Sequence, residues 1–128
     1  MDLHTPANAV PPLDADFEAA LDAIRGIHPG LELIADGLRL IALGRTSLDD
    51  TQTVTVALAG SPDHQDALAL IGYTVGRLTN PESNPGLHKI SLTAQKNTQL
   101  AGENLVRHLA DPDLHQHASD ASAAIHTD

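Results

Sequence analysis

Apolar residues recur every three or four positions through most of residues 13–110, which is the spacing of one face of a helix. The first stretch begins at Asp14 and places Phe17, Leu21 and Ile24 on one face. Acids fill its first turn, where the helix dipole favours negative charge. His28-Pro29-Gly30 is expected to end this helix, since Pro and Gly interrupt helical geometry.

The stretch 31–44 is apolar over most of its circumference, which is typical of a helix in the centre of a bundle. The alternative is a β-hairpin with strands 31–34 and 38–43 that turns at Asp36-Gly37, a dipeptide common in hairpins. We favour the helix because the helical spacing of apolar residues continues through Gly37.

The stretch 47–59 is the most ambiguous part of the chain. Ser47-Leu48-Asp49-Asp50 resembles a capping box, and Gly60 is a suitable residue to end a helix. The β-branched residues that alternate along 51–58 favour a strand instead. We predict a helix here and keep the strand as the alternative.

Ser61-Pro62-Asp63 predicts the start of the next helix, because Ser caps helices and Pro suits their first position. This helix is expected to end at Asn80 and to bury one stripe, formed by Leu68, Ile71, Val75 and Leu78. Gly72 and Gly76 lie four positions apart on a neighbouring face, where another backbone has room to approach closely. A last helix is expected over 91–110.

The predicted fold is therefore mainly α, a small bundle of four to five short helices. The alternative is an α+β fold with a short strand or a hairpin within 31–58. The helices form one expected domain over 13–110, preceded by a flexible segment, 1–12, and followed by an acidic, His-rich tail, 111–128.

Composition excludes several classes of function. The 128 residues contain no cysteine, so disulfides, thiolate nucleophiles and Cys-ligated metals are excluded. Direct binding of nucleic acid is not expected, because the seven basic residues are scattered and only two aromatic residues are present. The N-terminus has no signal-peptide pattern, and no apolar run is long enough to span a bilayer, so we expect a cytoplasmic protein without membrane attachment.

No motif for catalysis or cofactor binding occurs. Nucleophile-elbow, phosphate-loop and dinucleotide patterns are absent. His115-Gln116-His117 follows two acids and has metal-ligand residue types, but a mobile tail does not hold ligands in fixed geometry. The sequence therefore predicts no catalytic residue, no metal site and no cofactor, and a protein that is not an enzyme.

The net charge of −10 directs attention to the acids at the predicted helix starts, Asp49, Asp50, Asp63 and Asp66. These are the candidate interaction residues, although helices packed side by side would place the two pairs at opposite ends. The favoured hypothesis is a small acidic adaptor protein, not catalytic, with an unidentified protein partner. The alternatives are an antitoxin-like acidic inhibitor of a basic, nucleic-acid-binding partner, and a small-ligand binder or enzyme. A homodimer that buries more leucine surface is a further hypothesis.

Overall fold

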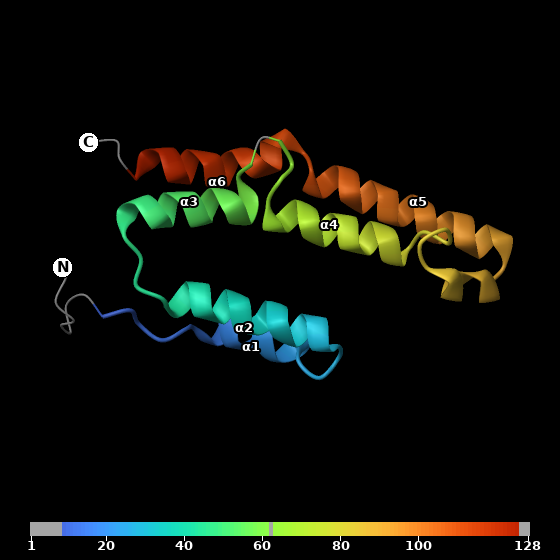
Figure 1. The fold of residues 1–128 in the computed structure, drawn as a ribbon, viewed down its shortest axis with the longest axis horizontal. Coiled ribbons are helices and arrows are strands. Elements are labelled where there is room, and N and C mark those ends of the chain that lie inside the picture. Colours follow the sequence, from blue (N-terminus) through green and yellow to red (C-terminus); the bar gives the residue numbers. More distant parts are fainter. Residues whose placement is uncertain (1–8, 62, 126–128) are drawn as a thin grey trace. The chain divides into compact units, whose positions relative to one another are not determined.

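The computed structural model describes residues 9–61 and 63–125, and these ranges contain six α-helices, one short 3-10 helix and no strand (Figure 1). The mainly α fold class is confirmed, and both β alternatives within 31–58 are wrong. Of the expected flexible segment, residues 9–12 form neither helix nor strand, and residues 1–8 lie outside the described ranges. The chain divides after Thr46 into two compact units, whereas the sequence analysis expected one domain over 13–110.

The first unit is a helical hairpin of α1 (Ala15–Ile24) and α2 (Pro29–Leu43). Asp14 caps α1 by accepting a hydrogen bond from the Phe17 amide at 2.8 Å. His28 caps α2 with its Nδ1 atom, which accepts from the Gly30 amide at 2.8 Å. Among residues 9–46 of this unit, α1 is the one helix that packs on α2, so α2 is not the central helix that its apolar circumference suggested.

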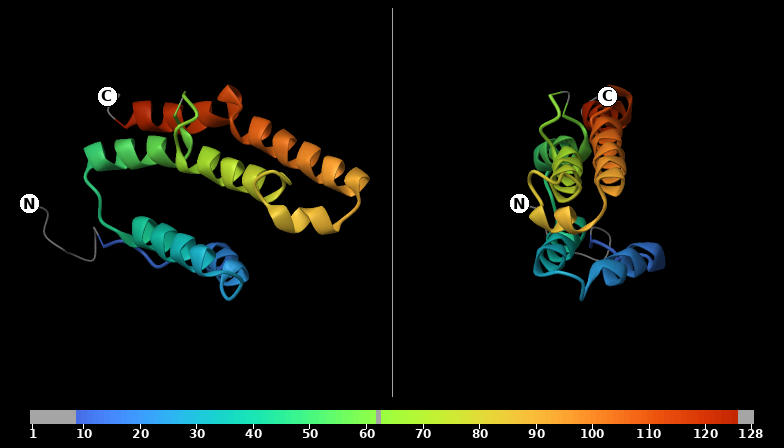
Figure 2. Two further views of the ribbon diagram at one scale, coloured as in Figure 1. Left: turned by 45° about the vertical axis from the view of Figure 1, so that its right-hand side comes forward. Right: turned by 90° about the vertical axis from the view of Figure 1, so that its right-hand side faces the viewer.

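The second unit contains α3 (Leu48–Ala59), α4 (Ala67–Leu78), the 3-10 helix η1 (Pro85–Lys89), α5 (Leu92–Leu109) and α6 (Pro112–Ala124). It is built from two helix pairs, α4 beside α5 and α3 beside α6, as both views in Figure 2 show.

Glycines bring α4 and α5 close together, as the spacing of Gly72 and Gly76 predicted. A Cβ atom added at Gly72 would lie 3.3 Å from a Leu109 methyl group, and one at Gly76 would lie 3.1 Å from a Val106 methyl group. The predicted buried stripe is wrong for two of its four members, because Ile71 and Leu78 are exposed. The glycine side of α4 packs against α5, and this orientation of the helix leaves these two side chains facing outward.

The expected C-terminal tail is corrected by α6, which occupies most of its described part, 111–125. Asp111 caps this helix by accepting from the Asp113 amide at 2.9 Å, and Pro112 takes the first helical position. The Gln52 side chain on α3 donates to the Ser122 carbonyl at 2.8 Å, and the Ser122 hydroxyl donates to the Gln52 carbonyl at 3.2 Å. These two hydrogen bonds join α6 to α3.

The start of α4 also differs from its prediction. The helix begins at Ala67 with Asp66 as its cap, six residues after Ser61. The Ser61 hydroxyl instead accepts from the amides of Asp63 and Gln65 at 3.3 and 3.4 Å, which makes it the cap of a turn. Pro62, expected at the first helical position, lies outside the described residues.

None of the helices in residues 9–61 and 63–125 has the length and apolar character of a membrane-spanning segment.

Candidate functional site

A buried ion pair joins three helices of the second unit. His115 on α6 places its Nδ1 atom 2.5 Å from Oδ2 of Asp66, and only 2% and 0% of the two side chains are exposed. The other ring nitrogen, Nε2, is hydrogen-bonded to the carbonyl of Leu109 at the end of α5. Asp66 also accepts from the amides of Ala69 and Ser61, at 2.9 and 3.0 Å. The pair therefore fixes the start of α4, the end of α5 and the first turns of α6.

The hydrogen bonds favour the charged form of both side chains. Both ring nitrogens of His115 face acceptors, so the imidazolium, which donates from both, fits best. The carbonyl of Leu109, followed by the Asp66 carboxylate, raises the pKa of His115 although burial opposes this. Burial favours the neutral acid at Asp66, but the bonds from Ala69, Ser61 and His115 outweigh it and lower the pKa of Asp66.

We expect the second unit to lose stability as the pH rises from neutrality. The pKa of His115 is higher in the folded than in the unfolded chain, so its contribution is complete below the unfolded value of about 6.5. This contribution disappears as the pH rises through the folded value. Asp66 acts oppositely: its contribution is present above its unfolded pKa of about 3.9 and is lost as the pH falls through the folded value. Urea unfolding should therefore show a lower free energy of unfolding at about pH 8.5 than at about pH 5.5.

The His115→Gln variant is the control for this pH dependence, because glutamine retains hydrogen-bonding groups without titrating. We expect the variant to lose less stability than the wild type between these two pH values. An equal loss in both proteins would show that another group is responsible.

His64 lies directly beside the ion pair. Its ring meets the ring of His115 edge to face, with 6.1 Å between ring centroids and 75° between planes. Its backbone is in the left-handed region, with φ 58°, which histidine adopts more readily than most residues. Nδ1 of His64 is buried and has no hydrogen-bond partner among the described residues. The ring of His64 therefore packs against the imidazole ring of the ion pair.

The ion pair has a structural role that sequence reasoning missed. The sequence analysis placed His115 in a mobile tail. Asp111-Pro112-Asp113 could have predicted α6, because this pattern can begin a helix as well as end the preceding one. The partner of His115 lies 49 residues earlier in the chain, and no local pattern indicates it.

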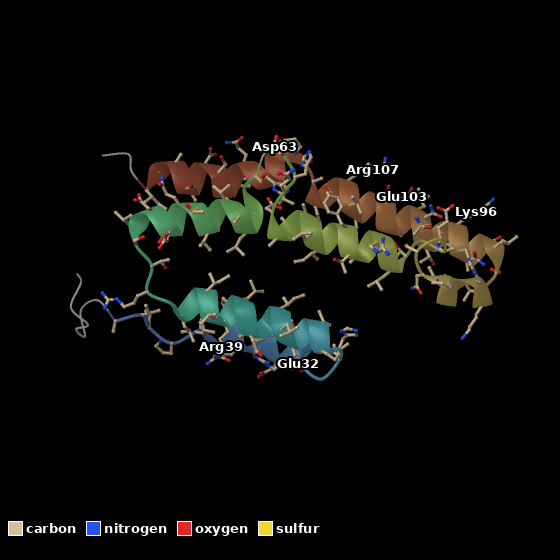
Figure 3. The ribbon with its side chains drawn as sticks, viewed as in Figure 1. Glu32, Arg39, Asp63, Lys96, Glu103 and Arg107 are labelled. Atoms are coloured by element: carbon tan, nitrogen blue, oxygen red, sulfur yellow. The ribbon has the colours of Figure 1, made fainter. Side chains whose placement is uncertain are left out.

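The structure does not bring the four candidate acids into one surface. Asp66 is buried in the ion pair, so the expectation that it is an interaction residue is corrected. Asp49 and Asp50 lie in the first turn of α3, whereas Asp63 lies in the loop after its other end (Figure 3). The twelve-residue helix between them is about 18 Å long, so Asp49 and Asp50 lie at one end of α3 and Asp63 follows the other. These acids do not form the single acidic face that an inhibitor of a basic partner would present.

An open hollow of about 530 Å³ lies at the turn between α1 and α2, lined by Gly26, Ile27, His28, Pro29, Glu32 and Leu33. Two of the polar groups in its lining are engaged within the chain, because Glu32 pairs with Arg25 at 3.0 Å and Nδ1 of His28 caps α2. Within the described ranges, no three His, Cys, Asp or Glu side chains are grouped as a metal ion would require.

The second unit also has an exposed, mainly apolar surface on α4. We call it the α4 outer face, formed by Leu70, Ile71, Tyr73, Arg77 and Leu78. The four uncharged side chains are 44 to 63% exposed, on the side of α4 away from α5. Between them, the Thr74 hydroxyl donates to the Leu70 carbonyl at 2.8 Å, so it offers no unpaired donor. The sequence signal for this face was that α4 is apolar on two sides.

Family models, curated proteins and solved structures were all compared with this chain, and none of them matches it. Its function is therefore inferred from the geometry of its own side chains.

Proposed function

We propose that this chain is a small interaction protein, not a catalyst, that binds a partner protein through the α4 outer face. The observation that carries the proposal is the concentration of Leu70, Ile71 and Leu78 on one side of one helix, with Tyr73 and Arg77 along one edge. Soluble proteins seldom leave such apolar surface uncovered without a use for it. Tyrosine and arginine beside an apolar centre are typical of the residues that dominate binding energy in protein interfaces.

The shape of this face favours a helical or grooved partner. A single helix presents a narrow ridge, and apolar residues at positions i, i+1 and i+8 fit a groove or the apolar face of an amphipathic helix. Arg77 adds an exposed guanidinium at one edge. The complementary partner therefore carries a carboxylate beside an apolar stripe.

The test is parallel affinity capture from the native source with the wild type, Leu70→Glu and a control variant, Leu100→Glu. Leu100 is an exposed leucine on α5, outside the α4 outer face. We expect a protein that the wild type and the control capture equally and that Leu70→Glu captures at least about tenfold less, as for loss of a binding hot spot. Both variants should unfold within about 0.5 kcal/mol of the wild type, because both side chains are exposed.

Two results would contradict the proposal. One is a captured partner whose amount does not differ between the wild type and Leu70→Glu. The other is an equal loss in Leu70→Glu and Leu100→Glu, because that would indicate general damage rather than a specific face.

A further inference from the structure

A second uncovered apolar surface lies in the first unit, on α2. We call it the α2 outer face, formed by Leu33, Ile34, Gly37, Leu40 and Ile41. The four large side chains are 41 to 75% exposed, and they lie on the side of α2 opposite to Ala35, which is buried. This surface is distinct from the α4 outer face and belongs to the other unit.

The α2 outer face is symmetric about its glycine. Leu33 and Ile34 precede Gly37 by four and three positions, and Leu40 and Ile41 follow it by three and four. A two-fold axis that passes through Gly37 perpendicular to the helix therefore exchanges Leu33 with Ile41 and Ile34 with Leu40. A surface that is complementary to itself in this way fits a second copy of the same chain.

Gly37 packs against none of the residues that the structure describes in its own chain. A Cβ atom added there would meet nothing within 4 Å, so internal packing does not require the glycine. Glycine in the middle of a helix lowers helix stability relative to alanine. A glycine also leaves room for another backbone to approach closely, as Gly72 and Gly76 leave room for α5 beside α4.

The charges of α2 are kept away from this face. Its three charged side chains, Glu32, Asp36 and Arg39, are all held in ion pairs with residues of α1 or of the turn that follows it. Figure 3 shows Glu32 and Arg39 on the side of α2 toward α1. Arg25 lies 3.0 Å from Glu32 and 2.9 Å from Asp36, and Arg39 lies 2.5 Å from Glu18. Two copies of a chain with a charge of −10 repel each other, so they associate best through a face without charge.

The first unit also has too small a core to be stable by itself. Among its described hydrophobic residues, only Leu21 and Ala35 are fully buried. Two short helices bury too little apolar surface to form a stable fold without a partner. Two such hairpins that share their α2 outer faces form a four-helix arrangement with one common core.

We propose that a second copy of this chain covers the α2 outer face, with the two α2 helices antiparallel and crossing at Gly37. Leu33 then packs beside Ile41 of the partner subunit, and Ile34 beside the partner subunit's Leu40. Two faces of this size bury on the order of 1,000 Å² together, the lower limit for a specific interface, so the dimer dissociates on dilution.

Sedimentation equilibrium tests the association. We expect the wild type to be a dimer at high concentration and Leu40→Glu to raise the dissociation constant by at least about 100-fold, because it places acids in the apolar contact. Leu40 is exposed in the single chain, so this substitution removes little packing within that chain and acts on the contact between copies. Leu100→Glu on α5, outside both faces, is the control and should dimerise normally. A monomeric wild type, or a dimer unaffected by Leu40→Glu, overturns the proposal.

Disulfide cross-linking tests the antiparallel geometry, because the chain has no cysteine of its own. Oxidised Gly37→Cys should form a covalent dimer, since the two-fold axis brings residue 37 of both copies together. Gly44→Cys should not, because residue 44 is seven positions from the axis and its two copies lie about 20 Å apart. Covalent dimers of Gly44→Cys, or none of Gly37→Cys, overturn the antiparallel crossing. Neither result bears on partner capture by the α4 outer face, so the two proposals succeed or fail separately.

Discussion

His115→Leu is expected to lower the free energy of unfolding of the second unit by about 3–5 kcal/mol, as when one partner of a buried ion pair is removed. Leucine fills much of the space but leaves the Asp66 carboxylate buried without its cation. The Leu109 carbonyl loses the donor at Nε2 as well. Urea unfolding near pH 6, followed by circular dichroism, measures the loss under conditions where His115 is charged in the wild type.

The matched control is His117→Leu, which makes the same substitution on the exposed side of the same helix. We expect it to alter stability by no more than about 0.5 kcal/mol. The double variant Asp66→Asn with His115→Leu should be more stable than the sum of the two single losses predicts, because it buries no unpaired charge and asparagine still caps α4. A loss in His115→Leu as small as that in His117→Leu would contradict the structural role of the ion pair.

Gly102→Ala is expected to destabilise the second unit by about 1–3 kcal/mol, the usual cost of forcing extra volume into a packed contact. Alanine is the better helix former by about 1 kcal/mol, so propensity alone predicts the opposite sign. The reason is Thr79, whose hydroxyl would overlap a Cβ atom at Gly102 and whose own Cβ would lie 2.8 Å away. Thr79 cannot turn aside easily, because its hydroxyl donates to the Val75 carbonyl at 2.8 Å.

Gly76→Ala, in the same pair of helices, is the control for Gly102→Ala. Its added Cβ atom meets a methyl group of Val106 at 3.1 Å, and a methyl group at the end of a side chain yields more easily than Thr79. Thermal unfolding should place Gly102→Ala clearly below Gly76→Ala. Equal midpoints would mean that the contact between α4 and α5 adjusts to accept a methyl group at either position.

Local patterns predicted much of the secondary structure. The apolar spacing across Gly37 predicted the helix that the structure has there, and the capping pattern at Ser47 outweighed the β-branched run that follows. Ser47 caps α3 by accepting from the Asp50 amide at 3.1 Å, as that pattern requires. These predictions succeeded because a cap and a helical stripe depend on residues within a few positions of each other.

Two local patterns were misleading because a distant partner decided the outcome. Ser61-Pro62-Asp63 has a good helix-start pattern, yet α4 begins where Asp66 can cap it and also accept from Ser61 and His115. The stripe assigned to the buried side of α4 includes two side chains that face outward, because the glycines on the neighbouring side pack closer to α5. Neither preference is visible without the contacting helix.

The sequence by itself determined that this chain is helical, where α3 and α5 begin and end, and that Gly72 and Gly76 admit a close neighbour. Only the tertiary structure decided which side of each helix is covered, that residues 112–124 are a helix packed on α3, and that Asp66 is an internal partner rather than a surface acid. The physical reason is the range of the forces involved. Helical hydrogen bonds and caps act between near neighbours in sequence, whereas burial depends on contacts such as Asp66 with His115, between residues far apart in the chain.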